Sequence, residues 1–235
     1  GINTHREFAA GTIARISEQT GLSFREARDH FEAQGARDSL VNAHGALNTV
    51  AVSLMKVADD IRWLASGPTS GLAEIQLPAI QPGSSIMPGK VNPVLSEALM
   101  MVSARVAGNH TTVTLAGGRG NFELNVMMPV MAHAFIESAT LLGNAAQTFA
   151  ACCVSGIRAN ALRSQELLER NPAIATVLNL HIGYDRATEI AKQAAREGRS
   201  VRDIVLELDL LPAEKVDEIL NVRDMTEPGL TDGDR

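Results

Sequence analysis

A heptad-like run of apolar residues between positions 38 and 66 restricts the possible folds of this chain more than any other feature. Its apolar side chains recur at alternating steps of three and four residues: Leu40, Ala43, Leu47, Val50, Leu54, Val57, Ile61 and Leu64. This spacing predicts one helix of about 45 Å. Four more apolar residues widen the stripe: Val41, Ala51, Met55 and Ala58. A helix that is apolar over more than one face needs more than one neighbour to cover it.

The same period predicts two further long helices. One begins at Asn92-Pro93, because Asn is a good N-cap and Pro is favoured at the first helical position. Its apolar face carries Leu95, Leu99, Val102 and Val106. The other begins near Pro129, and its face carries Met131, Phe135, Ser138, Leu142, Ala145, Phe149 and Cys152. Long helices with such regular faces pack as bundles, within one chain or between chains, so the predicted fold is all-α.

After Gly156 the predicted helices become short, at residues 160–170, 172–181, 185–197, 201–208 and 212–220. We therefore expect residues 1–155 to belong to a central helical bundle that includes a Pro- and Gly-rich loop at 66–93. Residues 156–221 are expected to form a small helical C-terminal domain, and 222–235 a flexible tail. A long loop of this composition between rigid helices is usually functional.

Charge and composition exclude several classes of function. The chain has 27 acidic and 21 basic residues, a net charge of −6, which argues against nucleic acid as a partner. A membrane partner is not expected, because no apolar run reaches the ~18 residues that a membrane span needs. No secretion signal is apparent, so a cytoplasmic location is predicted. The adjacent Cys152 and Cys153 are predicted to be buried in a helix, with no metal site.

The loop segment Gly83-Ser84-Ser85-Ile86-Met87-Pro88-Gly89-Lys90-Val91-Asn92-Pro93 carries the chemistry of a site. Lys90 and Asn92 immediately precede a predicted helix start. A cation, an amide donor and the positive end of a helix together favour a carboxylate or phosphate ligand. Ser84 and Ser85 place two hydroxyls on the same loop, where they could take part in proton transfer.

Two other interpretations of this segment exist. A phosphate-binding P-loop also has a Gly-Lys pair, but it needs four residues where this chain has five between Gly83 and Gly89. Val91 also occupies the position at which a Ser or Thr would reach magnesium, and no strand pattern precedes the loop. A solvated linker with incidental Ser and Lys residues is the plainer alternative.

The whole segment resembles the signature of the fumarase/aspartase superfamily, whose members eliminate a group from succinyl-type substrates to give fumarate. Residues 66–74, 120–125 and 179–185 resemble other stretches of that family. Gly89 and Asn121 resemble the class II fumarase branch, since aspartases have Ala and Gln there. The resemblance implies a long-helix bundle of the fumarase/aspartase type. It also implies reversible hydration of fumarate to L-malate, a step of the tricarboxylic acid cycle, without a metal or other cofactor.

The resemblance also implies roles for single residues. Ser84 would be the base that removes the C3 proton of malate, with its alkoxide stabilised by Lys90, loop amides and the helix dipole. Glu97 would orient a histidine that acts with a water at the other carbon. The residues implied to bind the substrate carboxylates are Ser85, Lys90, Val91 and Asn92.

The chain departs from the family at its start. Gly1-Ile2-Asn3 resembles the end of a glycine-rich region near the middle of the family's chains, and the Thr-His segment expected to supply the partner histidine is absent. We therefore expect this to be the C-terminal half of such an enzyme, inactive alone, within a homotetramer whose active sites are shared between chains. Five scattered histidines are expected to be structural: His30, His44, His110, His133 and His181. Aspartate ammonia-lyase activity and an assembly-only role remain as alternatives.

Overall fold

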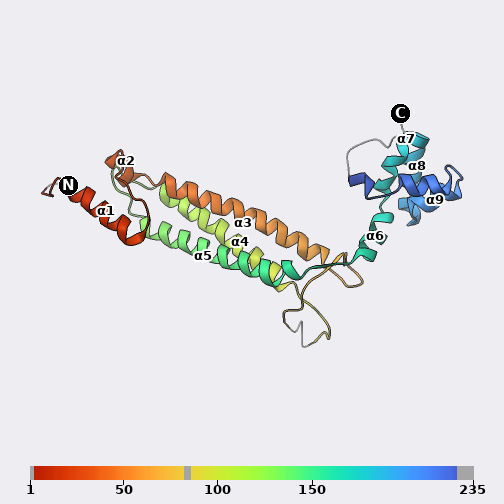
Figure 1. Cartoon of the computed structure of the whole chain (residues 1–235), viewed down its shortest axis with the longest axis horizontal. Coiled ribbons are helices and arrows are strands. Elements are labelled where there is room, and N and C mark those ends of the chain that lie inside the picture. Colours follow the sequence, from red (N-terminus) through yellow and green to blue (C-terminus); the bar gives the residue numbers. More distant parts are fainter. Residues whose placement is uncertain (1–2, 82–85, 227–235) are drawn as a thin grey trace. The chain divides into compact units, whose positions relative to one another are not determined.

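The computed structural model describes residues 3–81 and 86–226, which are mostly helical (Figure 1). They divide into two compact units. One combines the residues up to 62 with 79–155, and the other combines 63–78 with the residues from 156 onward. In the described part of the chain, no helix is both long and apolar enough to cross a membrane.

The first unit is built on three long helices, as predicted. It contains α1 (Phe8–Thr20), α2 (His30–Gly35), most of α3 (Asp38–Leu64), α4 (Val94–Gly117) and α5 (Met128–Cys152). α4 runs antiparallel to α3 and α5, which lie beside it (Figure 1). Each long helix contributes one buried residue to a shared apolar cluster: Ala51 of α3, Val106 of α4 and Leu142 of α5. The all-α bundle expected from the sequence is thereby confirmed.

The predicted face of α3 is displaced by one residue from the observed one. The buried residues of α3 are His44, Ala51 and Ala58, which repeat every seven positions. Val50 and Val57 precede two of them and were predicted to be in the seam, but they are 49% and 43% exposed. The apolar face of α3 is wide enough to contain both the predicted row of residues, with Val50 and Val57, and the observed row, with Ala51 and Ala58. α4 and α5 cover the row that contains Ala51. A second apolar line of α3 therefore stays outside this unit's core.

The predicted faces of α4 and α5 are largely confirmed. Leu99 and Val106 of α4 are buried, as are Met131, Ser138, Leu142 and Phe149 of α5. The prediction for the cysteines is wrong for Cys152, which is exposed, whereas Cys153 is buried. The buried position that follows Phe149 on this face lies four residues on, at the C-cap Cys153, and Cys152 is turned away from it. Burial raises the pKa of the Cys153 thiol.

The second unit contains the predicted short helices. They are α6 (Ala161–Glu169), a 3₁₀ helix (Pro172–Leu178), α7 (Asn179–Ile182), α8 (Tyr184–Glu197), α9 (Val201–Glu207) and α10 (Ala213–Ile219). Leu178, Ile190, Ile204 and Val216 are among the residues of its apolar core. Gly198 closes α8 in the left-handed conformation (φ 64°), and Ser200 caps α9 by accepting from the amide of Asp203 at 3.0 Å.

A two-residue strand pair in this unit was not predicted. β1 (Ile75–Gln76) pairs antiparallel with β2 (Arg158–Ala159). Next to it, the Asn160 amide side chain donates to the carbonyl of Ala73 at 3.0 Å, and Arg163 Nε donates to that of Leu72 at 3.1 Å. The segment that follows α3 is therefore fixed to the beginning of α6.

The end of α2 meets the α4–α5 turn backbone to backbone. A Cβ added at Gly35 would overlap the carbonyl oxygen of Phe122, and one added at Gly120 would overlap that of Gly35. Because both obstacles are backbone atoms, no side-chain rotation can relieve the overlap. These two glycines permit the close approach of the two segments.

We predict that Gly35→Ala lowers the free energy of unfolding by about 1–3 kcal/mol, because the Phe122 carbonyl must move. Urea unfolding monitored by circular dichroism measures this. The matched control is Gly108→Ala inside α4, where an added Cβ meets nothing within 4 Å. That change should stabilise the protein by about 0.5–1 kcal/mol through helix propensity. Equal unfolding midpoints for the two variants would contradict the close approach.

Candidate active site

The loop that leads into α4 forms a tight turn with exposed side chains. The amide of Lys90 donates to the carbonyl of Met87 at 3.3 Å, and Gly89 between them has a positive φ of 77°. Lys90 and Val91 are exposed, and Asn92 is half-buried. The predicted residues Ser84 and Ser85 lie outside the described residues. The Lys90 ammonium group is therefore presented on the surface just before a helix start.

α4 begins at Val94, and Pro93 occupies the cap position with φ −79° and ψ 52°. The prediction that Asn92 caps this helix is wrong: Pro93 has a non-helical ψ and takes the cap position, so the helix starts one residue later than predicted. The side chain of Pro93 makes no capping hydrogen bond to the helix. The first-turn amides of a helix have no intrahelical partner, and such amides bind anions well.

Glu97 lies in the first turn of α4, four residues after Pro93. Its side chain is 46% exposed, and Oε1 is 4.0 Å from Nε of Arg62 in the last turn of α3. The neighbouring Ser96 is fully buried. Glu97 therefore lies off the buried face of α4, half-exposed to solvent beside Arg62. The predicted orientation of a histidine by Glu97 stays a prediction.

Four histidines of the first unit lie on other segments or deeper in the bundle than this helix start. His30 is 3.1 Å from Glu26, and His133 is exposed on α5. His44 and His110 stack on each other inside the bundle. Among residues 3–81 and 86–226, no group of three or more His, Cys, Asp or Glu side chains is arranged to hold a metal. The structure thus places Lys90, Val91, Asn92 and Glu97 at one helix start and pairs Glu97 with an arginine.

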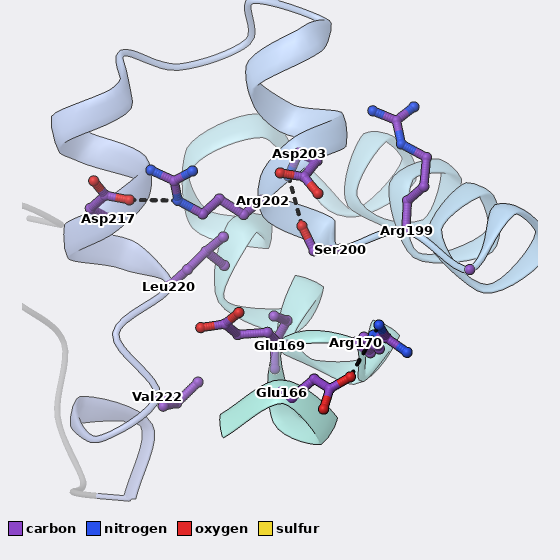
Figure 2. Close-up of a pocket in the computed structure, with 12 residues that line it drawn as sticks. Glu166, Glu169, Arg170, Arg199, Ser200, Arg202, Asp203, Asp217, Leu220 and Val222 are labelled. Carbon is purple, nitrogen blue, oxygen red and sulfur yellow. Dashed lines mark hydrogen bonds and ion pairs between the residues drawn. The ribbon is translucent and has the colours of Figure 1, made fainter. Parts of the chain in front are cut away.

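Sequence reasoning missed a pocket of about 610 Å³ in the second unit (Figure 2). Arg202 Nε lies 2.8 Å from Asp217, and Arg170 lies 3.1 Å from Glu166. The bond from Arg202 lowers the pKa of Asp217. The residues that line this pocket are mostly charged residues of short amphipathic helices, and their sequence pattern does not predict a pocket. Because these arginines already have carboxylate partners, the pocket does not provide an obvious clamp for a substrate carboxylate.

Two family models match the chain. A lyase model matches residues 1–108, and a model described as the fumarase C C-terminus matches residues 174–227. The chain is 49% identical over 240 residues to "Fumarate hydratase class II" of Mycobacterium tuberculosis, covering 100% of this chain and 51% of that one. It is 49% identical over 228 residues to "Fumarate hydratase, mitochondrial" of Homo sapiens, covering 97% and 45%.

Solved structures give the same similarity. A class II fumarase from Schistosoma mansoni matches with a TM-score of 0.89 and 35% identity, over 97% of this chain and 51% of that one. A "fumarate lyase:delta crystallin" from Brucella melitensis bound to cobalt matches with a TM-score of 0.90 and 40% identity, over 97% and 49%. The chain spans about half the length of the relatives it matches.

We predict that Glu97→Gln changes the free energy of unfolding by no more than about 0.5 kcal/mol, because a half-exposed ion pair contributes little. Arg62→Gln should behave alike. Glu137→Gln is the control, since that carboxylate accepts from both Asn109 and Arg105 and its loss should cost clearly more. A large loss of stability in Glu97→Gln would assign Glu97 a structural role.

Proposed function

The chain belongs to the class II fumarase branch of the fumarase/aspartase superfamily. From that membership we propose that it supplies the serine loop of an enzyme that hydrates fumarate reversibly to L-malate. The 47–49% identity to fumarate hydratases over almost the whole chain is the observation that carries the proposal. The loop from Gly83 to Pro93 supports the same assignment. The proposed substrate is thus a small dicarboxylate.

In the proposed mechanism the positive groups at the start of α4 bind the substrate. The Lys90 ammonium, the Asn92 amide and the first-turn amides of α4 attract the carboxylates, and Ser85 and Val91 complete the binding segment. Ser84 takes the C3 proton of malate, and the resulting aci-carboxylate dianion is stabilised by the same positive groups. Elimination of hydroxide from the adjacent carbon then gives fumarate.

The leaving hydroxide needs a group on the opposite side of the substrate. We propose that Glu97 orients a histidine from outside this chain, which acts there together with a water. The exposure of Glu97 on the outer side of α4 supports this role, because it leaves the carboxylate accessible to another segment. The active site is then composite, and this chain alone is inactive.

We further propose that the site is assembled in a homotetramer. Large apolar side chains remain exposed on all three bundle helices, including Val50 (49%), Met101 (68%) and Ile136 (64%). Burying such side chains against copies of the same bundle removes apolar area from water. The cytoplasmic location stays a prediction, because the relatives include a mitochondrial protein.

Assays of the full-length enzyme on malate and on aspartate test the proposal. We expect turnover of malate and none of aspartate. Ammonia release from aspartate without malate turnover would favour an aspartate ammonia-lyase. No turnover of either substrate by the full-length assembly would favour the assembly-only role.

We predict that Ser84→Ala in the full-length enzyme lowers kcat at least ~10²-fold, the usual scale for a positioned acid or base, with a smaller effect on KM. Steady-state kinetics on malate measure both constants. Near-normal kcat in this variant would remove Ser84 from the mechanism. Lys90→Ala is the comparison: it should weaken binding of substrate and transition state together, by roughly 1.5–3 kcal/mol for a charge-assisted bond.

We predict that the full-length protein sediments as a tetramer at micromolar concentration. Replacing Val50 and Val57 together by Lys should favour smaller species, because both side chains lie on the exposed apolar line of α3. Lys56→Arg on the same helix is the control and should leave the tetramer intact. A monomer of the unmodified protein would contradict the assembly.

A further inference from the structure

Two histidines stack inside the α3–α4–α5 bundle, apart from the proposed active site. His44 of α3 is fully buried, and its ring centroid lies 5.4 Å from that of His110 of α4, with 10° between the ring planes. The ring of Phe135 on α5 meets His44 at 5.8 Å in a T-shaped contact. His44 therefore contacts both of the other long helices.

The polar contacts of His44 suit a neutral ring. Its Nε2 lies 2.9 Å from Ser138 Oγ, and that oxygen also accepts from the Asn109 amide at 3.0 Å. The Nδ1 atoms of His44 and His110 are both buried and find no hydrogen-bond partner among the described residues. A neutral imidazole has one N–H to satisfy, but an imidazolium has two. Protonated His44 would thus bury a positive charge, and backbone hydrogen bonding at His44 and Ala134 offsets only part of that cost.

α3 is attached to the other two helices through side chains. α4 and α5 approach each other closely along their backbones, whereas α3 reaches them through the apolar cluster around Ala51 and through His44. The His44 contacts are thus a substantial part of what holds the first half of α3. Weakening them should release this helix before it separates α4 from α5.

We propose that the His44–His110 stack makes the bundle acid-sensitive: α3 stays attached while the His44 ring is neutral and detaches from α4 and α5 when His44 is protonated beside His110. Two positive rings at this separation repel each other, and the buried surroundings screen that repulsion weakly. The proton comes from solvent, and its acceptor is an imidazole nitrogen.

Burial, and next the neighbouring His110, lower the pKa of His44. The unfolded chain, with an ordinary histidine pKa of about 6.5, therefore binds a proton more readily than the folded one. The contribution of neutral His44 to the free energy of unfolding is therefore fully present above about pH 6.5. It is lost progressively as the pH falls from this value toward the lower pKa of His44 in the folded chain.

The other charged or titratable groups near the stack are Glu137 and His133 on α5 and Arg105 on α4, which lies 2.9 Å from Glu137. Hydrogen bonds from Asn109 and Arg105 lower the pKa of Glu137, so its carboxylate stays ionised in weak acid. On α3 itself, no other titratable residue lies between Ser39 and Met55.

Urea unfolding of the full chain between about pH 5 and pH 7.5 tests the proposal. The unfolding equilibrium constant should rise as the pH falls, by up to about tenfold per pH unit for one proton. His110→Asn should flatten this dependence, because the neighbouring charge is removed. His133→Asn replaces an exposed histidine of the same bundle and should keep the original slope.

A second readout does not depend on a variant. Imidazole NMR of the unmodified chain should show His44 titrating below the ordinary histidine pKa of about 6.5. The amides of α3 should lose their native signals before those of α4 and α5. A pH-independent unfolding constant over this range would overturn the proposal. So would an unchanged slope in His110→Asn, or simultaneous loss of the signals of all three helices.

Discussion

Three helices share one small core, in which Ala51 of α3, Val106 of α4 and Leu142 of α5 meet. Each of these helices is apolar over a wider arc than its two neighbours in the chain can cover. Val50 and Val57 stay half-exposed directly beside the buried line of α3. This surplus of apolar surface is the constraint from which the proposed assembly follows.

The helical bundle fixes the position of the candidate site, and the start of α4 with Lys90 before it supplies the positive charge. α4 fixes Glu97 one turn inside its N-terminus and presents Lys90 just before it. The same helix carries Asn109 and His110 in its second half, where polar side chains link the three helices. One helix thus joins a region suited to anion binding with a polar core that is sensitive to protonation. The first region favours positive charge, whereas the second is stable while its imidazole rings are neutral.

Much of the fold and the site's location could be predicted from local patterns. The period of three and four residues located α3, α4 and α5, and Gly198 marked the end of α8. The sequence pattern did not show that Ala51 is buried and Val50 exposed, because the apolar face of α3 is wide enough for either residue to be at its centre. The packing of α4 and α5 determines which of the two is buried. Nor did they find the β1–β2 pair or the contact of His44 with Ser138, since these join segments far apart in the sequence. The roles of Ser84 and Glu97 came from the family resemblance.

Mixing this chain with a separately expressed N-terminal half tests the central claim, that this chain holds one side of a composite active site. Malate formation from fumarate should be absent for either half alone and should appear on mixing. It should not appear when the mixed chain carries Ser84→Ala, while the two halves still co-sediment. Turnover by this chain alone, at a rate near that of the intact enzyme, would contradict the account.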